Sequence, residues 1–455
     1  MIKPGATMQS ISYPQGHVLL RKLKGEIPFI DRGEGIYLYD KSGKKYIDAS
    51  GGAFVTSIGH GQKEVIEKIT AQMSKVSYVN GRHFATEVSE SLASKLAAKA
   101  PKGLDRVYFL SSGSEAIEAA IKFARQYFFC KGLNEKKKII AQIPSYHGNT
   151  IFALSASGRP QYKKYFSPFV TETLRIEAPM KYRCPVAGYE DAGSKYYLDK
   201  LEALILAEGP ESVACILLEP VGGSSTGGAC PPRKYLKGVQ ALCEKYEIFC
   251  IADEVLVGVG RTGYFFASEK DQFVPDIIVL AKGLNGGYAP LSAMITKTEH
   301  VDVLARESAG FLHAQTFVNN PLGCAAGDAV VDFIERHKLV ENARELGGYF
   351  QEQLSRELSS LSIVGNVTGR GLLAGVEFVK DKTSKAPFKK SAMIYDKVQN
   401  ILFGMGLVTW GNGAHVDGEN GDIVLLAPPL IVDKKQVDVI VETFKAGVKK
   451  LESTL

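Results

Sequence analysis

The sequence lacks long hydrophobic runs and a strong net charge, and both absences narrow the class of protein. No stretch reaches the roughly 18 apolar residues needed to span a bilayer, and residues 1–16 contain no hydrophobic signal segment. We therefore expect a cytoplasmic protein that does not insert into a membrane. The net charge of +6 is small for 455 residues. The lysine run at residues 136–138 is predicted to be a solvated loop rather than a nucleic-acid-binding patch.

Cysteine and tryptophan are also scarce. The seven cysteines form no Cys-x-x-Cys pair and no zinc-type spacing with histidine, and Cys215 and Cys250 lie inside apolar runs. We expect reduced core thiols and no metal site. Trp410 is the single tryptophan. It is expected to be a packing residue, with the wall of a substrate pocket as the alternative.

Short apolar segments alternate with helical stretches in the middle of the chain. Five of these segments have the length of a strand, namely residues 106–110, 138–141, 214–218, 248–252 and 277–280. Continuous apolar strands between helices indicate a sheet that is covered on both faces. This region is therefore predicted to be an α/β domain with a largely parallel sheet.

The two ends of the chain are predicted to form a second, smaller α+β domain. A hairpin is expected at residues 35–47, where aromatic strands flank a turn at residues 40–43. Amphipathic helices with a few strands are expected after about residue 325. We predict that residues 1–65 and 326–455 make up the small domain and that residues 66–325 make up the large one.

Polar residues directly follow each of the five predicted strands. These polar segments are residues 111–116, 145–148, 219–220, 253–254 and 281–283. Open α/β sheets bind ligands at the carboxyl ends of their strands. The carboxyl ends of these five strands are expected to converge, and the residues that follow them include one lysine and one aspartate. This arrangement predicts a functional site.

The segment at residues 112–114, Ser-Gly-Ser, precedes a helix predicted over residues 117–127 and is suited to bind an anion. Glycine lets the backbone approach closely, and a helix N-terminus presents free N–H groups. The alternative is a simple N-cap with Glu115 in the first turn. A P-loop is excluded because no lysine follows the glycine, and the glycines at residues 258–263 do not open a strand-to-helix turn.

Asp253 and Lys282 each lie at the end of an apolar strand. A carboxylate is costly there unless a cation meets it, and a protonated pyridine nitrogen would be such a cation. Gly283, Gly286 and Gly287 allow close approach to the amine of Lys282. Taken alone, a structural ion pair between Asp253 and Lys282 is an equally good interpretation.

These segments resemble the class III (ornithine/ω-amino acid) aminotransferases, pyridoxal-phosphate enzymes of fold type I, over nearly the whole chain. The most specific match is residues 251–263, followed at the expected distance by residues 281–284. Further matches occur in the family order at residues 112–116, 146–148, 219–221, 316–317, 320–321 and 428–430. The resemblance implies a large domain with a mostly parallel central sheet between helices, plus a smaller α+β domain.

The resemblance also implies the chemistry of Lys282 and Asp253. Lys282 would carry pyridoxal 5′-phosphate as a Schiff base and move a proton, while Asp253 would pair with the pyridinium nitrogen. The expected reaction moves an amino group from an amino acid, ω-amino acid or diamine to pyruvate or 2-oxoglutarate by a ping-pong mechanism. The alternatives are another reaction of the same cofactor (aminomutase, epimerase or decarboxylase) and a non-catalytic cofactor-binding regulator.

The remaining matching residues are implied to hold the cofactor. Gly113 and Ser114 would bind its phosphate together with Thr316 of the partner subunit. Tyr146 would stack on one face of the ring, and Val255 would pack on the other. Because Thr316 would complete a neighbouring site, the resemblance implies a homodimer or a tetramer.

The sequence departs from the family at the substrate end of the site. Glu219 is counted with the cofactor-binding residues and matches an acid near the substrate pocket. In ornithine and GABA aminotransferases an arginine pairs with this acid and admits the α-carboxylate. That arginine position is Leu425 here, and residues 408–412, where other members place a mobile arginine, contain none. How a substrate carboxylate is bound is therefore open.

Several aromatic side chains and one histidine have no assigned role. Phe54, Tyr78 and Phe84 are each expected to pack in the core rather than to line the pocket. His147 follows the family pattern, but a histidine in a loop is expected to be structural.

Overall fold

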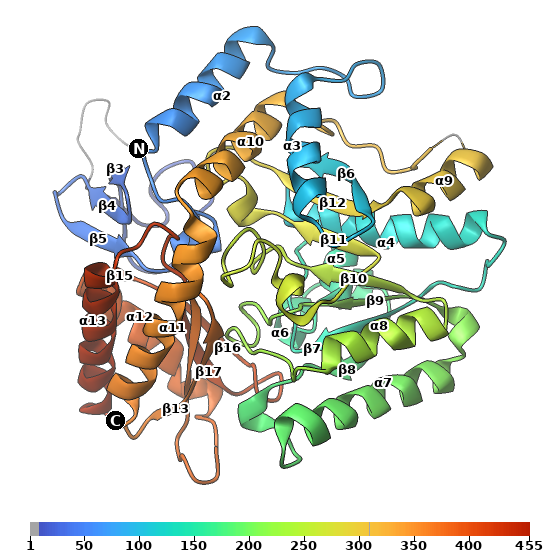
Figure 1. Cartoon of the computed structure of the whole chain (residues 1–455). Helices are drawn as coiled ribbons and strands as arrows, with labels where there is room; N and C mark the ends of the chain where they lie inside the picture. Colours follow the sequence, from blue (N-terminus) through green and yellow to red (C-terminus); the bar gives the residue numbers. More distant parts are fainter. Residues whose placement is uncertain (1–8, 309) are drawn as a thin grey trace.

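A seven-stranded sheet lies at the centre of the computed structural model, which describes residues 9–308 and 310–455 (Figure 1). In spatial order the strands are β6 (Leu104–Leu110), β12 (Ser292–Lys297), β11 (Ile277–Leu280), β10 (Phe249–Asp253), β9 (Val213–Leu218), β7 (Lys138–Ile143) and β8 (Leu174–Glu177). Only the two pairings of β12 within this sheet are antiparallel. The five strands that the sequence predicts therefore all run in the same direction.

Helices cover both faces of this sheet. On one face, α4 (Gly113–Cys130) packs in a cluster with alternate strand residues such as Ile251. On the other face, Cys250 and its neighbours pack with α7 (Ser194–Glu208) and α8 (Tyr235–Lys245). Because neighbouring side chains of a strand point to opposite faces, burial on both sides requires the continuous apolar strands seen in the sequence. The predicted α/β architecture with a mostly parallel sheet is confirmed.

Two four-stranded sheets form beside the central sheet. One has the order β13 (Val364–Arg370), β14 (Leu373–Phe378), β17 (Asp422–Leu426) and β16 (Trp410–Gly413), and the other has the order β15 (Leu407–Val408), β5 (Lys45–Asp48), β4 (Tyr37–Asp40) and β3 (Ile30–Glu34). The predicted hairpin is confirmed as β4 and β5. A strand from late in the chain, β15, pairs in parallel with β5. The domain boundaries after residues 65 and 325 stay a prediction.

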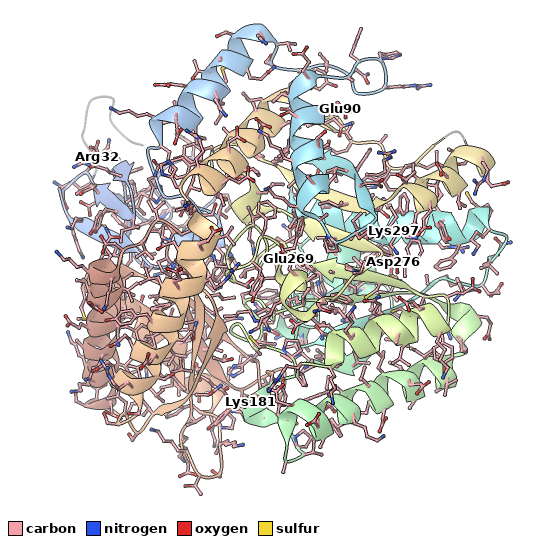
Figure 2. All side chains as sticks on the ribbon, viewed as in Figure 1. Arg32, Glu90, Lys181, Glu269, Asp276 and Lys297 are labelled. Carbon is pink, nitrogen blue, oxygen red and sulfur yellow. The ribbon has the colours of Figure 1, made fainter. Side chains whose placement is uncertain are left out.

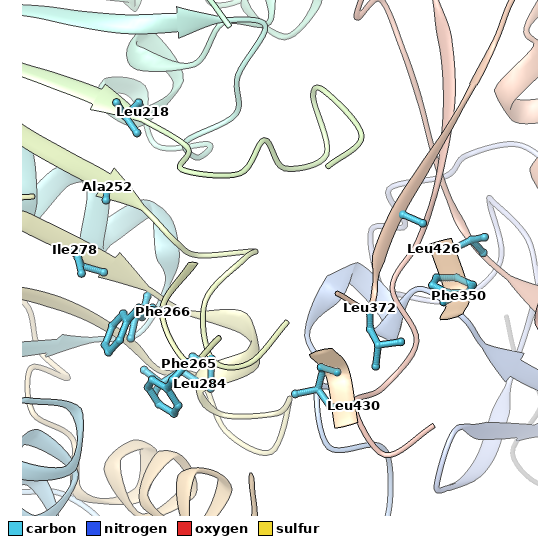
Figure 3. Close-up of a cluster of buried hydrophobic side chains, with 14 of the residues drawn as sticks. Leu218, Ala252, Phe265, Phe266, Ile278, Leu284, Phe350, Leu372, Leu426 and Leu430 are labelled. Atoms are coloured by element: carbon cyan, nitrogen blue, oxygen red, sulfur yellow. The ribbon is translucent and has the colours of Figure 1, made fainter. Parts of the chain in front are cut away.

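One hydrophobic cluster connects the central sheet with the other sheets. Figure 3 shows Ala252 and Ile278 on strands of the central sheet, and Leu430 and Leu426 on the opposite side. Phe266 lies near the strand ends in the same view and is fully buried. The hydrophobic core therefore continues from the central sheet to the neighbouring four-stranded sheet that contains β17.

Other helices surround these sheets. They are α1 (Gly51–Phe54), α2 (Lys63–Lys75), α3 (Glu87–Lys99), α5 (Ile151–Ala156), α6 (Pro160–Lys163), α9 (Thr298–Glu307), α10 (Pro321–Arg336), α11 (Leu339–Leu358), α12 (Ile394–Gly404) and α13 (Lys434–Glu452). The start of α10 is fixed by Asn320, whose side chain accepts from two backbone N–H groups, and by proline at the first helical position. No helix in the described ranges is long and apolar enough to cross a membrane.

Polar side chains at the rim of the central sheet fix strand ends. In Figure 2, Asp276 and Lys297 lie side by side, and the Lys297 ammonium is 3.0 Å from Asp276 Oδ1. The other oxygen of Asp276 accepts the backbone N–H of Cys250 at 2.9 Å. One carboxylate therefore connects β10, β11 and β12.

The lysine run at residues 136–138 differs from its prediction. Lys136 is only 4% exposed. Its ammonium donates to the carbonyl oxygens of Pro210, Val213 and Tyr246 at 3.1, 3.3 and 3.0 Å. The prediction of a solvated loop is wrong for Lys136 because three carbonyl groups from distant segments converge on its amine.

Candidate active site

A cavity of about 530 Å³ lies at the carboxyl ends of the central strands. Each of the five predicted strand ends contributes to its wall. Representative residues, one from each end, are Ser112, Tyr146, Glu219, Asp253 and Lys282. The predicted convergence of polar groups is therefore present in the structure.

Lys282 is held in an unusual backbone conformation directly after β11. Its φ of 42° lies in the left-handed region, which costs a non-glycine residue on the order of 1 kcal/mol. The Lys282 Nζ lies 5.5 Å from the centre of the Phe54 ring. Burial lowers the pKa of Lys282, while the carboxyl groups of Asp253 and Glu219 oppose this shift. A lowered pKa increases the fraction of neutral, nucleophilic amine.

Asp253 lies at the end of β10 and has two fixed hydrogen bonds. Its Oδ2 is 2.7 Å from His147 Nδ1, which must donate because a carboxylate only accepts, and its Oδ1 accepts the Val255 N–H at 3.0 Å. Asp253 is 5% exposed and His147 is 3% exposed. Within the described ranges, His147 is the one salt-bridge partner of Asp253. Asp253 and Lys282 are therefore not within salt-bridge distance of each other, and the structural ion pair considered from the sequence is not formed.

The start of α4 and its N-cap residue form part of the cavity wall. Ser112 caps the helix by accepting the Glu115 N–H at 3.3 Å, so the N-cap interpretation is correct and is compatible with a place in the cavity wall. A Cβ on Gly113 would lie 3.0 Å from Val255 Cγ1, so only glycine fits without displacement. Ser114 Oγ donates to Asn149 Oδ1 at 2.8 Å. Free N–H groups at the start of this helix suit a phosphate.

Glu219 is buried beside this cavity without a basic partner within salt-bridge distance among the described residues. It is 9% exposed, and its Oε1 accepts the Gly223 N–H at 3.1 Å. Burial raises the pKa of Glu219 to about 7. Leu425 is fully buried and belongs to an apolar cluster with Phe54 and Trp410, so no charge stands at the position of the family arginine.

The aromatic residues divide into two groups. Phe54 is 3% exposed, and its ring centre lies 5.6 Å from that of half-buried Trp410. Tyr78 and Phe84 are 42% and 66% exposed, so the expectation of core packing is wrong for both. Thr316 is exposed and does not belong to the described residues that line the cavity.

Sequence reasoning assigned no role to His147, which lines this cavity, or to Arg159, which lies beside it. His147 was expected to be structural, and its contact with Asp253 joins residues that are 106 positions apart. Arg159 lies in the loop before α6, with its guanidinium 5.6 Å from the centre of the Tyr146 ring. His147 matches the family pattern, but the local sequence does not reveal its partner, and no local pattern marks Arg159, because the neighbours of both residues come from distant parts of the chain.

The fold and the site together define a class of protein. A mostly parallel sheet presents a lysine, an aspartate and a helix N-terminus around one cavity, and these groups fit the aldehyde, ring nitrogen and phosphate of pyridoxal phosphate. The chain belongs to the aminotransferase class-III family, whose model matches residues 22–448. It is therefore a pyridoxal-phosphate-dependent aminotransferase.

Individual relatives and a solved structure support the same family assignment. An uncharacterized aminotransferase of Schizosaccharomyces pombe is 38% identical over 430 residues, with 94% of this chain and 93% of the relative covered. The diaminobutyrate–2-oxoglutarate transaminase of Halomonas elongata is 35% identical over 437 residues, with 94% and 91% covered. The solved structure of an (S)-enantioselective omega-transaminase from Thermomicrobium roseum matches with a TM-score of 0.88 and 34% identity, covering 93% of this chain and 92% of that one. The predicted family, fold type and general reaction are confirmed.

Proposed function

We propose that this enzyme moves an amino group from an amino acid, ω-amino acid or diamine to pyruvate or 2-oxoglutarate by a ping-pong mechanism, with its cofactor bound to Lys282 as a Schiff base. The observation that carries this proposal is the convergence of Lys282, Asp253 and His147 on one cavity. The Halomonas elongata relative is named for 2-oxoglutarate, which supports this acceptor.

Lys282 and Asp253 have separate tasks in the proposed mechanism. When bound, the cofactor supplies an aromatic ring that accepts negative charge from the substrate carbon. The Asp253 carboxylate holds a proton at the ring nitrogen, and His147 keeps this carboxylate in place. The Lys282 amine, whose pKa is lowered by burial, takes a proton from the substrate carbon and returns it at the end of the transfer.

The residues around the ring bind and orient the cofactor in this proposal. The backbone N–H groups at Gly113 and Ser114 bind the phosphate, since they open α4 at the cavity wall. Tyr146 and Val255, which also line the cavity, would pack against the ring. Both side chains exclude water from the position at which the proton moves.

We further propose that the enzyme is a homodimer or a tetramer in which Thr316 of the partner subunit completes the phosphate site. Thr316 is exposed in the single chain, and the neighbouring Phe317 is 51% exposed. Phe317 and half-exposed Tyr78 form an edge-on ring pair with centres 5.9 Å apart, so the residue that follows Thr316 belongs to an exposed aromatic pair. The cytoplasmic location stays a prediction.

Replacing Lys282 with alanine tests the proposed function. K282A is expected to lose the absorbance of the lysine-bound cofactor and all transfer from a panel of amino acids, ω-amino acids and diamines to pyruvate or 2-oxoglutarate. K434A, which removes an exposed lysine of α13, is the matched control and should retain both properties. Carbon dioxide release or substrate isomerisation by the wild-type enzyme would favour the alternative reactions. Cofactor binding without turnover of any amine would favour a regulator.

A further inference from the structure

Arg159 is a buried cation that forms no salt bridge with any acidic residue that the structure describes. Only 4% of the residue is exposed. Its Nε donates to Ser225 Oγ at 2.8 Å, and its Nη1 donates to the Tyr162 hydroxyl and to Asn412 Oδ1, each at 3.0 Å. All three acceptors are neutral.

One nitrogen of the guanidinium accounts for the interest of this residue. Nη2 of Arg159 is buried and has no partner among the described residues. Burying a charged donor without an anion is costly, and the same burial lowers the pKa of Arg159. Glu219 is the nearby acid, but it lies outside salt-bridge distance, and its own pKa is raised by burial to about 7. The charge of Arg159 is therefore available to an anion that enters from outside.

Arg159 itself does not line the active-site cavity, but two residues close to it do. The guanidinium lies 5.6 Å from the centre of the Tyr146 ring, which lines the cavity. Ser224 lines the cavity too, and its carbonyl oxygen accepts from Asn412 Nδ2 at 2.7 Å. Asn412 thus connects Arg159 with the wall of the cavity. A carboxylate next to Tyr146 and Ser224 would be close to this cation.

Alternative cations near the cavity are less suitable. Lys282 is assigned to the cofactor, and Leu425 places an apolar side chain where the family has its arginine. Arg21 is close enough to influence the pKa of Tyr146, but it is exposed, and water screens its charge. Arg159 has the low-dielectric setting in which a charge binds an anion strongly.

We propose that Arg159 binds the carboxylate of the amino acid and 2-oxo acid substrates through Nη2, and so takes the role of the arginine that Leu425 replaces. This inference rests on the proposed aminotransferase function. Because Nη2 is covered in this conformation, the proposal includes a shift of the half-buried Tyr162 side chain, which exposes the guanidinium when the substrate binds. The enzyme would then select substrates with a carboxylate.

The test compares amines with and without a carboxylate in the holoenzyme. R159Q is expected to raise the KM for 2-oxoglutarate and for an ω-amino acid by about 10- to 100-fold, as for the loss of a charge-assisted hydrogen bond. The half-reaction of an uncharged primary amine should stay within about twofold of the wild-type rate. R159K should restore part of the affinity because it keeps the charge. R21Q is the matched control and should behave like the wild type.

Binding of glutarate gives a second readout that does not depend on turnover. Trp410 is the single tryptophan and lies two residues before Asn412, so its fluorescence should report glutarate binding. R159Q should raise the glutarate dissociation constant by a similar factor, and R159K should raise it less. Equal losses for charged and uncharged amines, unchanged glutarate binding in R159Q, or the selective loss in R21Q instead would each overturn the proposal. If the wild type transferred no amino group, the proposed function would fail, whereas the glutarate titration would still decide the role of Arg159.

Discussion

The imidazole of His147 donates from Nδ1 to Oδ2 of Asp253 over 2.7 Å, and both side chains are buried. The second carboxylate oxygen accepts the backbone N–H of Val255. Two fixed donors on one buried carboxylate leave it little freedom to rotate. His147 is therefore a positioning residue for the acid that we assign to the ring nitrogen.

Removing this hydrogen bond should slow the reaction without preventing cofactor binding. H147F is expected to lower kcat by about 10- to 100-fold, because an unsatisfied buried acceptor costs about 1–3 kcal/mol. H147N, whose side-chain amide can still donate, should recover part of the rate. The control is H337N, which changes an exposed histidine at the end of α10. Wild-type kcat in H147F would show that Asp253 needs no support from His147.

Gly113 should be required for tight cofactor binding. In G113A the added Cβ would lie 3.0 Å from Val255 Cγ1. Because overpacking costs about 1–3 kcal/mol, the dissociation constant of the cofactor should rise by about tenfold. Spectroscopic titration of the cofactor-free protein measures this constant. G348A is the matched control because a Cβ at this helical position meets no atom within 4 Å. Equal affinities in G113A and G348A would contradict the assigned phosphate site.

Glu219 should make the stability of the cofactor-free protein depend on pH. Burial raises the pKa of Glu219 from 4.5 to about 7. Between these values the unfolded chain releases the proton while the folded chain retains it, so the free energy of unfolding should fall as the pH rises toward 7. The total loss should be up to about 3 kcal/mol.

Urea unfolding at a series of pH values measures this effect. In E219Q the side chain cannot ionise, so its contribution to the pH dependence should disappear, and the difference between wild type and variant should change mainly between pH 4.5 and about 7. The same slope in both proteins would show that Glu219 titrates normally in the folded state.

Thr316 should act on the site of the neighbouring subunit. T316V is expected to weaken cofactor binding by about tenfold through the loss of one hydrogen bond to a charged group. A hybrid dimer of one K282A subunit and one T316V subunit separates the two possible arrangements. If Thr316 acts between subunits, the hybrid has one site with both native residues and should bind one cofactor tightly. If it acts within its own subunit, neither site is intact.

The arrangement of the central sheet could be predicted to a large extent from the sequence. The strands β9 and β10 are fully buried on both faces, and such strands must be continuously apolar, so the pattern is visible in the sequence itself. Two strands of the same sheet, β8 and β12, were missed. The burial of β8 is mixed, and β12 runs against its neighbours, so neither shows the regular strand and helix alternation that identified the others.

The sequence by itself placed Lys282 and Asp253 at the ends of apolar strands, which meet at one edge of a parallel sheet, and the resemblance to the family then assigned both residues to the cofactor. Only the tertiary structure decided which groups orient and complement them. The contacts of His147 with Asp253 and of Arg159 with Asn412 join residues 106 and 253 positions apart. Strand periodicity is a local property, whereas the partner of a buried charge depends on how distant segments pack.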